Sequence, residues 1–374
     1  MASNNTLSCS EGFRSSVDYK NTRIEWVDIA KGIGILLVVW AHIHDSGNLC
    51  IIIYSFHMPL FFMLSGFLFN PNKYNGVREF LTKKTKSLVI PYLIVACITL
   101  MFHILINKVY WQGLSGFTDS ENLKYFFQIF IAQGSPNMRF NTPLWFVLCL
   151  FIVEITYYFI AKIQNLSIKA FTVVFCVLIG WYLESSLFAF GPLQLPWSID
   201  SALFALGFYA IGNLIGKYSM DSNSSKWKNN RLFLLTTAII SLVVLIPLAL
   251  YNGSVSMGSK RLNNGFLFYI TGVLGSISVI NLSMLISRFR LLEYIGRKSF
   301  YIMAFHIPCM FPLPILWSKV EKETGLRYFN KDNAFECILP FIYVCITCLV
   351  IVFILEKVKE IFERLKGLRT WKNY

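Results

Sequence analysis

Apolar runs long enough to cross a bilayer recur along the whole chain, and they constrain its fold more than any other feature. A helix of about 20 mainly apolar residues spans the hydrocarbon core. Because 55% of the 374 residues are hydrophobic and only 14% are charged, an ordinary soluble domain is excluded. The sequence predicts an all-α integral membrane protein with about ten transmembrane helices. We place them near residues 27–45, 50–69, 88–107, 143–161, 168–185, 199–216, 232–250, 266–286, 299–318 and 335–355.

Lysine and arginine residues orient these spans. With the N-terminus inside, 24 of the 34 fall in cytoplasmic segments and nine in outer segments, while Lys31 lies within the first span. This bias predicts that both termini are cytoplasmic. The net charge of +14 then reflects topology, and we expect no nucleic-acid partner. We divide the chain into a cytoplasmic tail (1–22, without the apolar core of a signal peptide), a membrane domain (23–355) and a basic cytoplasmic tail (356–374).

Two further patterns bear on the fold. The nine cysteines are scattered, and Cys345 and Cys348 have redox spacing but lie in an apolar segment, which favours packing. We therefore expect neither a disulfide framework nor a metal site. In the outer connection 108–142, the segment LKYFFQIFIAQ is apolar but too short to span, which predicts a helix at the interface or one that dips into the membrane.

The first predicted span carries a polar stripe. At about 100° per residue, Asp28, Lys31, Ile35, Val38 and His42 fall near one helix face. Lys31 and His42 are eleven residues apart and lie almost in line, about 16 Å apart along the axis. Asp28 and Lys31 have the spacing of an i, i+3 pair and line the same path. His42 is the candidate catalytic base, since a neutral imidazole accepts a proton near physiological pH. The alternative is a helix whose charged residues sit at the inner interface and whose histidine faces outer water.

The second predicted span adds a histidine of its own, after a loop of about eight residues between the apolar segments 27–41 and 50–69. His57 and Pro59 lie in its outer half, where the proline interrupts the backbone hydrogen bonds. Ser65 and Gly66 permit close helix contact. A single histidine here is usually a packing residue. Histidines on adjacent helices favour a cavity shared between the two spans, and this neighbour strengthens the interpretation of His42.

Four other sets of residues are candidates. Lys83 and Lys86 share a face in the basic loop after the second span, where they either hold phosphates of an anionic cofactor or simply anchor the loop. Glu154 is a carboxylate within the fourth span and is a functional candidate by default. Trp145 lines a pocket or belongs to the interfacial aromatic belt. His306, about one third of the way across the ninth span, has either a catalytic or a structural role.

Taken in order, these motifs resemble the membrane-bound acyltransferase 3 family. The succession is DIAKGIGILLVVWAH, YSFHMPLFFMLSGFLF, a basic loop leading into a proline-started helix, PLWFVLCLFIVE and IGRKSFYIMAFHIP, over roughly residues 23–310. The closest resemblance is to its fucose O-acetylase-like branch of sugar acetyltransferases. The family's basic residue and histidine in helix one match Lys31 and His42. Its basic pair in the first inner loop matches Lys83 and Lys86, where arginine is common, and lysine lacks the bidentate fork for phosphate.

The resemblance implies an O-acyltransferase that moves an acetyl group from acetyl-CoA to a hydroxyl of a cell-surface glycan or lipid-linked sugar precursor. His42 then acts as the base, directly or through an acetyl-histidine. Lys31 lines the path of the donor together with Asp28, and Lys83 and Lys86 hold CoA phosphates. The pocket residues are His57, Trp145, Glu154 and His306.

The protein is then expected in a bacterial inner membrane, in contact with lipid. The predicted topology puts His42 near the outer face and CoA inside, so the pantetheine arm has to thread a channel along the stripe. The alternatives are an exporter of surface polysaccharide, a transferase of another short acyl group such as succinyl, and a non-catalytic scaffold.

Overall fold

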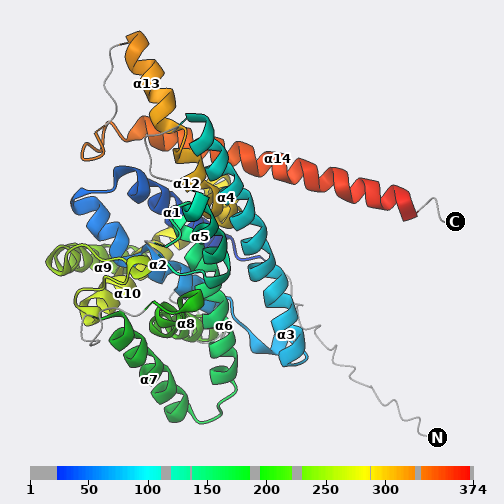
Figure 1. The fold of residues 1–374 in the computed structure, drawn as a ribbon. Coiled ribbons are helices and arrows are strands. Elements are labelled where there is room, and N and C mark those ends of the chain that lie inside the picture. The colour runs from blue at the N-terminus through cyan, green and yellow to red at the C-terminus, as the bar shows by residue number, and fades with distance from the viewer. Residues whose placement is uncertain are drawn as a thin grey trace, which may run out of the picture.

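The computed structural model describes residues 23–110, 119–134, 137–185, 194–220, 230–286, 288–324 and 330–370. Within these ranges the chain forms helices and no strands, and nine helices are long and apolar enough to cross a membrane. The protein is therefore an all-α, multi-span membrane protein, as predicted (Figure 1). The predicted N-terminal tail, residues 1–22, lies outside the described residues.

The α-helices run in chain order as α1 (Glu25–His44), α2 (Gly47–Phe67), α3 (Val77–Lys84), α4 (Ile90–Tyr110), α5 (Asp119–Ile131), α6 (Trp145–Ala161), α7 (Leu166–Glu184), α8 (Ile199–Met220), α9 (Arg231–Asn252), α10 (Gly265–Leu285), α11 (Arg290–Arg297), α12 (Ser299–Met310), α13 (Leu313–Thr324) and α14 (Ile338–Thr370). The helix α5 contains most of the short apolar segment of the outer connection and packs against α4.

The connection between α1 and α2 is shorter than predicted. Only Asp45 and Ser46 separate the two helices, where the sequence suggested about eight residues. Asp45 has φ 50° and Gly47 has φ 79°, two left-handed conformations that reverse the chain abruptly. Aspartate tolerates this region because its short side chain bonds locally, and glycine has no Cβ to clash. The two helices that carry His42 and His57 are thus held as close neighbours.

The predicted span 299–318 is broken. Helix α12 ends at Met310 and α13 begins at Leu313. Pro308, Pro312 and Pro314 fall within this short stretch, and each lacks the N–H that a continuous helix requires. The sequence pattern gave the apolar length correctly but not this interruption. Among the described residues, the ninth predicted span is therefore a 12-residue helix, α12, shorter than the nine helices that are long enough to cross a membrane.

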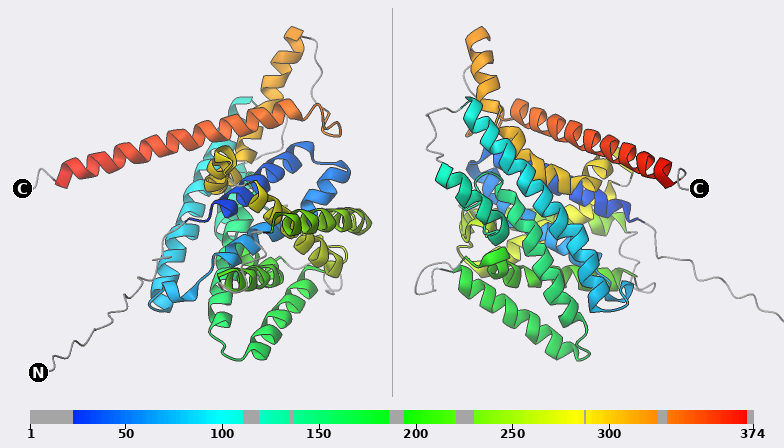
Figure 2. Two further views of the ribbon diagram at one scale, coloured as in Figure 1. Left: turned by 180° about the vertical axis from the view of Figure 1, so that it is seen from behind. Right: turned by 45° about the vertical axis from the view of Figure 1, so that its right-hand side comes forward.

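The third predicted span begins earlier than expected and contains a change of helix type. Helices α3 and α4 are joined by a π-helical segment, Thr85–Val89, and together they form one rod along the side of the bundle (Figure 2). A π turn inserts an extra residue into an α-helix and is frequent at functional sites. This one brings Leu88 to a cavity described below.

Helix α14 continues 15 residues beyond its predicted end at 355 and projects from the bundle (Figure 1). The extension contains helix-favouring residues with ion pairs one turn apart, Lys357 with Glu360 and Lys359 with Glu363. Beyond Glu356 the described side chains of this extension are exposed, and such pairs support a helix there.

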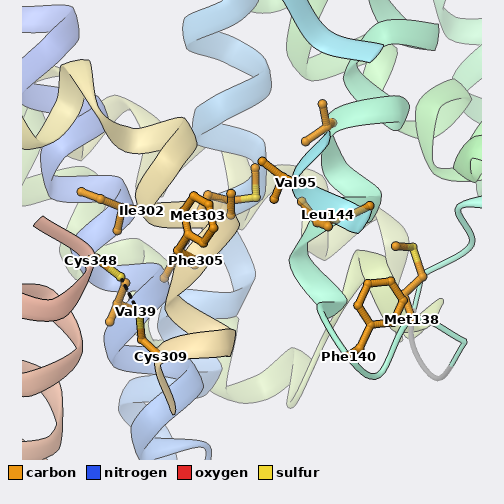
Figure 3. Packing of buried hydrophobic residues seen from close by; sticks show 14 of the residues in the cluster. Val39, Val95, Met138, Phe140, Leu144, Ile302, Met303, Phe305, Cys309 and Cys348 are labelled. Carbon is orange, nitrogen blue, oxygen red and sulfur yellow. Dashed lines mark hydrogen bonds between the residues drawn. The ribbon is translucent and has the colours of Figure 1, made fainter. Parts of the chain in front are cut away.

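The interior is assembled by close helix crossings and apolar side chains. Helix α2 crosses α8 where a Cβ added to Gly66 would lie 2.0 Å from the carbonyl oxygen of Tyr209, so only glycine fits. Around α12, buried side chains of α1, α4 and α14 pack on Met303 and Phe305 (Figure 3). Cys348 is buried there, with its sulfur 3.8 Å from that of Cys309. The described cysteines are all free.

Candidate active site

A cavity of about 410 Å³ lies within the bundle, and four of the nine predicted site residues line it: Lys31, His42, His57 and Trp145. Lys31, Ile35, Val38 and His42 all line it, so the stripe on α1 faces one continuous space. These four residues recur at helical spacing, which is why one helix can line a cavity over about 16 Å of its length. The cavity size lies within the usual range of small-molecule sites.

Asp28 lies beside this stripe but is bonded elsewhere. Its carboxylate is buried and accepts hydrogen bonds from Arg23, with Oδ2 2.5 Å from Nε and Oδ1 3.3 Å from Nη2. The sequence favoured a pair between Asp28 and Lys31, but Arg23 precedes the helix and reaches the carboxylate first. Lys31 therefore faces the cavity and forms no ion pair within the part of the chain that the structure describes.

Histidines from three helices gather around His42. The hydroxyl of Tyr54 lies 3.4 Å from its Nδ1, and the ring centroid of His306 lies 5.1 Å from its own. The ring of His57 stands edge-on to Tyr54 at 5.0 Å between centroids. Helix α1 supplies His42, α2 supplies Tyr54 and His57, and α12 supplies His306. His42, Tyr54 and His57 line the cavity, and His306 lies behind His42.

Backbone carbonyls fix the tautomers of two of these histidines. Nδ1 of His57 donates to the carbonyl of Ile53 at 2.9 Å, and Nδ1 of His306 donates to that of Met303 at 2.9 Å. A carbonyl only accepts, so the proton sits on Nδ1 and the lone pair on Nε2. Nε2 of His306 is buried and has no hydrogen-bond partner among the described residues. A buried unsatisfied nitrogen is costly and marks a group reserved for another contact.

One end of the cavity is closed by parts of the chain that the sequence patterns only partly indicated. Thr142, Pro143 and Trp145 at the start of α6 form one wall, as the PLW motif suggested for Trp145. The adjoining wall is the turn between α9 and α10, where Met257–Ser259 form a 3-10 helix. Nothing in the polar loop 251–265 distinguished this turn in the sequence. By the predicted topology, both walls belong to the outer half of the protein.

At the opposite end, the cavity is lined by Lys31, Ser65 of α2, Leu88 of the π segment and Ser299 of α12. The two lysines predicted to bind phosphate do not line it. Lys83 pairs with Glu79 at 2.5 Å on an exposed face, and Lys86 is exposed. By the predicted topology, this end is cytoplasmic.

Glu154 lies apart from the cavity. Its carboxylate is 5% exposed and pairs with Lys84 at 2.8 Å. Lys84 lies in the sequence between Lys83 and Lys86, but its side chain points into the bundle, toward Glu154. The structure thus gives this intramembrane carboxylate a partner that fastens α3 to α6.

A second cavity, of about 480 Å³, lies between α7, α8 and α10 and is almost entirely apolar. Lys169 is the one charged side chain on its walls. Among the described residues, its walls contain no histidine, carboxylate or thiol, so the first cavity is the better candidate for the chemistry.

The fold and this cavity define a multi-span membrane protein whose helices enclose one cavity, lined by the basic residue Lys31 and by the histidines His42 and His57. A family model described as an acyltransferase domain matches residues 24–356, and the chain belongs to this family, acyltransferase 3. Membership makes the protein a membrane acyltransferase. No curated protein matches the chain significantly.

Proposed function

We propose that the protein transfers an acetyl group from acetyl-CoA to a hydroxyl of a cell-surface glycan or lipid-linked sugar precursor, in a bacterial inner membrane. The observation that carries this proposal is the continuous cavity from Lys31 to His42. It offers the path that a donor needs to reach His42 from the cytoplasm. The fucose O-acetylase-like motifs support a sugar hydroxyl as acceptor.

His42 acts as general base in this reaction. It takes the proton of the acceptor hydroxyl as the oxygen attacks the thioester carbonyl. A C–O bond forms, the C–S bond breaks, and His42 returns the proton to the departing thiolate. The products are an acetyl ester and CoA. Transfer through an acetyl-histidine uses the same residue in two steps and gives the same products.

Neighbouring groups orient His42. Tyr54 contacts Nδ1, so the opposite nitrogen is the one available for the acceptor. His306 stands behind the ring with an unpaired lone pair on Nε2, which can stabilise the positive charge that His42 gains when it takes the proton. His57 and Trp145 shape the pocket for the acceptor.

The donor enters at the end marked by Lys31. Its ammonium faces the cavity without a carboxylate partner in the described chain, and therefore attracts an anionic or strongly polar donor. Asp28 holds Arg23 beside this entrance. Lys86 is exposed two residues before Leu88, which lines the cavity, and it is the better candidate for CoA phosphates because Lys83 is already paired with Glu79.

The test is transfer of radiolabel from acetyl-CoA in membranes containing the wild-type chain or His42→Ala at matched expression. His103→Ala is the control, since His103 is a buried histidine on α4 outside the cavity. We expect label in a glycan or lipid-linked sugar with wild type and His103→Ala but not with His42→Ala.

Absence of label in every sample, with glycan still reaching the surface, would favour the exporter. Label from succinyl-CoA but not acetyl-CoA would favour a different short acyl group. Equal labelling by wild type and His42→Ala would exclude His42 as the base.

A further inference from the structure

A buried charge cluster lies directly behind the outer wall of the cavity. Lys260 follows the turn Met257–Ser259, and its Nζ lies 2.9 Å from Asp200 Oδ1, 3.5 Å from Glu184 Oε1 and 2.5 Å from Ser201 Oγ. Lys260 is 5% exposed and the two carboxylates are 0–1% exposed. Glu184 ends α7, Asp200 and Ser201 begin α8, and Lys260 comes from the α9–α10 connection, so the cluster ties three segments together.

The burial of these charges and the backbone conformation of Lys260 are both energetically unfavourable. Burying a lysine and two carboxylates costs several kcal/mol per ion unless they compensate one another. Oε2 of Glu184 and Oδ2 of Asp200 receive no hydrogen bond from the described residues. Lys260 also has φ 55°, a left-handed conformation that is unfavourable for a long side chain.

The neighbouring cation shows that burial is specific to Lys260. Arg261 is exposed and donates to the hydroxyl of Ser254 at 2.7 Å. The two residues are adjacent in the same connection, yet only the side chain of Lys260 points inward. The connection therefore presents one cation to solvent and one to the buried carboxylates.

The anchored turn touches the cavity through Gly258. A Cβ added there would lie 2.6 Å from Nε1 of Trp145, so the turn backbone presses against the indole. On another side, a Cβ added to Gly134 would lie 2.1 Å from the carbonyl oxygen of Gly258. A turn held this closely on both sides transmits any displacement of Lys260 to Trp145 and to the cavity wall.

We propose that Lys260 is a positioning residue that fixes the turn Met257–Ser259 against Trp145 and so sets the acceptor end of the cavity. This rests on the proposed function, because it assigns the outer end to the acceptor hydroxyl. Asp200 and Glu184 hold the ammonium, and the turn supplies the surface that the acceptor meets. Lys260 contacts no reacting atom.

The test compares Lys260→Met with Arg261→Met, which removes the exposed cation of the same connection. For Lys260→Met we expect the KM of the acceptor to rise about tenfold to 100-fold, with the KM of acetyl-CoA unchanged, because displacement of a wall by about 1 Å has effects of this size. Arg261→Met should retain both values.

A triple variant, Lys260→Met with Asp200→Asn and Glu184→Gln, separates position from stability. It removes the uncompensated carboxylates and should regain thermal stability relative to Lys260→Met, while the acceptor KM stays raised because the anchor is still missing. If the triple variant restores the acceptor KM, the cluster acts only on stability and the proposal is overturned.

A readout that needs no reaction completes the design. Met257 is 2% exposed, so Met257→Cys should react slowly with a maleimide, and faster when Lys260→Met is added. The parent chain with its native cysteines is the background. An inactive wild type would count against the proposed function alone, while labelling still tests the anchored turn. Unchanged labelling, or an unchanged acceptor KM in an active Lys260→Met enzyme, overturns this inference.

Discussion

The rings of His42 and His306 lie 5.1 Å apart between centroids, although 264 residues separate them in the sequence. His306 presents an unprotonated Nε2 because its Nδ1 is bonded to its own helix. An imidazole whose lone pair is fixed in this way can stabilise the positive charge of a neighbouring base that has accepted a proton. This relationship makes His306 the natural partner of His42.

Replacing His306 with Phe should lower kcat about tenfold to 100-fold, because the imidazolium of His42 then forms without a neighbouring lone pair to stabilise its charge. The KM of acetyl-CoA should change little, since His306 lies away from Lys31. Steady-state kinetics in detergent, with His103→Phe as the control, measures both values. A His306→Phe enzyme with wild-type kcat would show that His306 only fills space.

The acetyl transfer should lose rate in acid. His42 accepts a proton only when its imidazole is neutral, so lowering the pH through its titration removes the base. On the acid side, kcat/KM should fall about one decade per pH unit and level off at higher pH. A pH series with the purified enzyme records this profile, and a flat profile across the acid range would contradict a histidine base.

Lys31→Met should raise the KM of acetyl-CoA about tenfold while leaving the acceptor KM near its wild-type value, because the unpaired ammonium faces the donor end of the cavity. Arg23→Met is a matched control: it removes a neighbouring cation that is engaged by Asp28 and does not line the cavity. Donor titrations at saturating acceptor compare them. Equal effects of the two substitutions would mean that only overall charge matters.

Lys84→Met should destabilise the protein by about 2–4 kcal/mol, because it leaves the buried carboxylate of Glu154 without its partner. Thermal unfolding in detergent measures the loss. The double variant Lys84→Met, Glu154→Gln should recover most of it, since the unpaired charge is gone. Both KM values should remain near wild type. A donor KM that rises in the double variant would instead place this pair in the donor path.

The sequence predicted the features that depend on local spacing. Helical periodicity is sufficient to put Lys31, Ile35, Val38 and His42 on one face, and the structure places all four along one cavity. Apolar length likewise located the spans. The i, i+3 spacing of Asp28 and Lys31 failed as a predictor of their pairing, because Arg23 outside the helix competes for the same carboxylate.

The contacts that depend on tertiary structure were not predictable. The sequence places Lys260 in a polar loop, where a lysine is expected to be solvated, yet its partners Glu184 and Asp200 lie 76 and 60 residues earlier in the chain. Lys84 was overlooked between two other lysines because the π segment alters which of them faces the bundle. The periodicity of a single sequence does not reveal contacts between residues that lie far apart in the chain.

The π segment Thr85–Val89 sets how far helix α3 is rotated about the common axis relative to helix α4. One inserted residue turns everything before it by about 100° relative to everything after it. Lys84 thereby points at Glu154, while Leu88 faces the cavity. Deleting a single residue here would restore an unbroken α-helix, but both side chains could no longer keep their places. This short segment therefore couples the geometry of the cavity mouth to the attachment of helix α3.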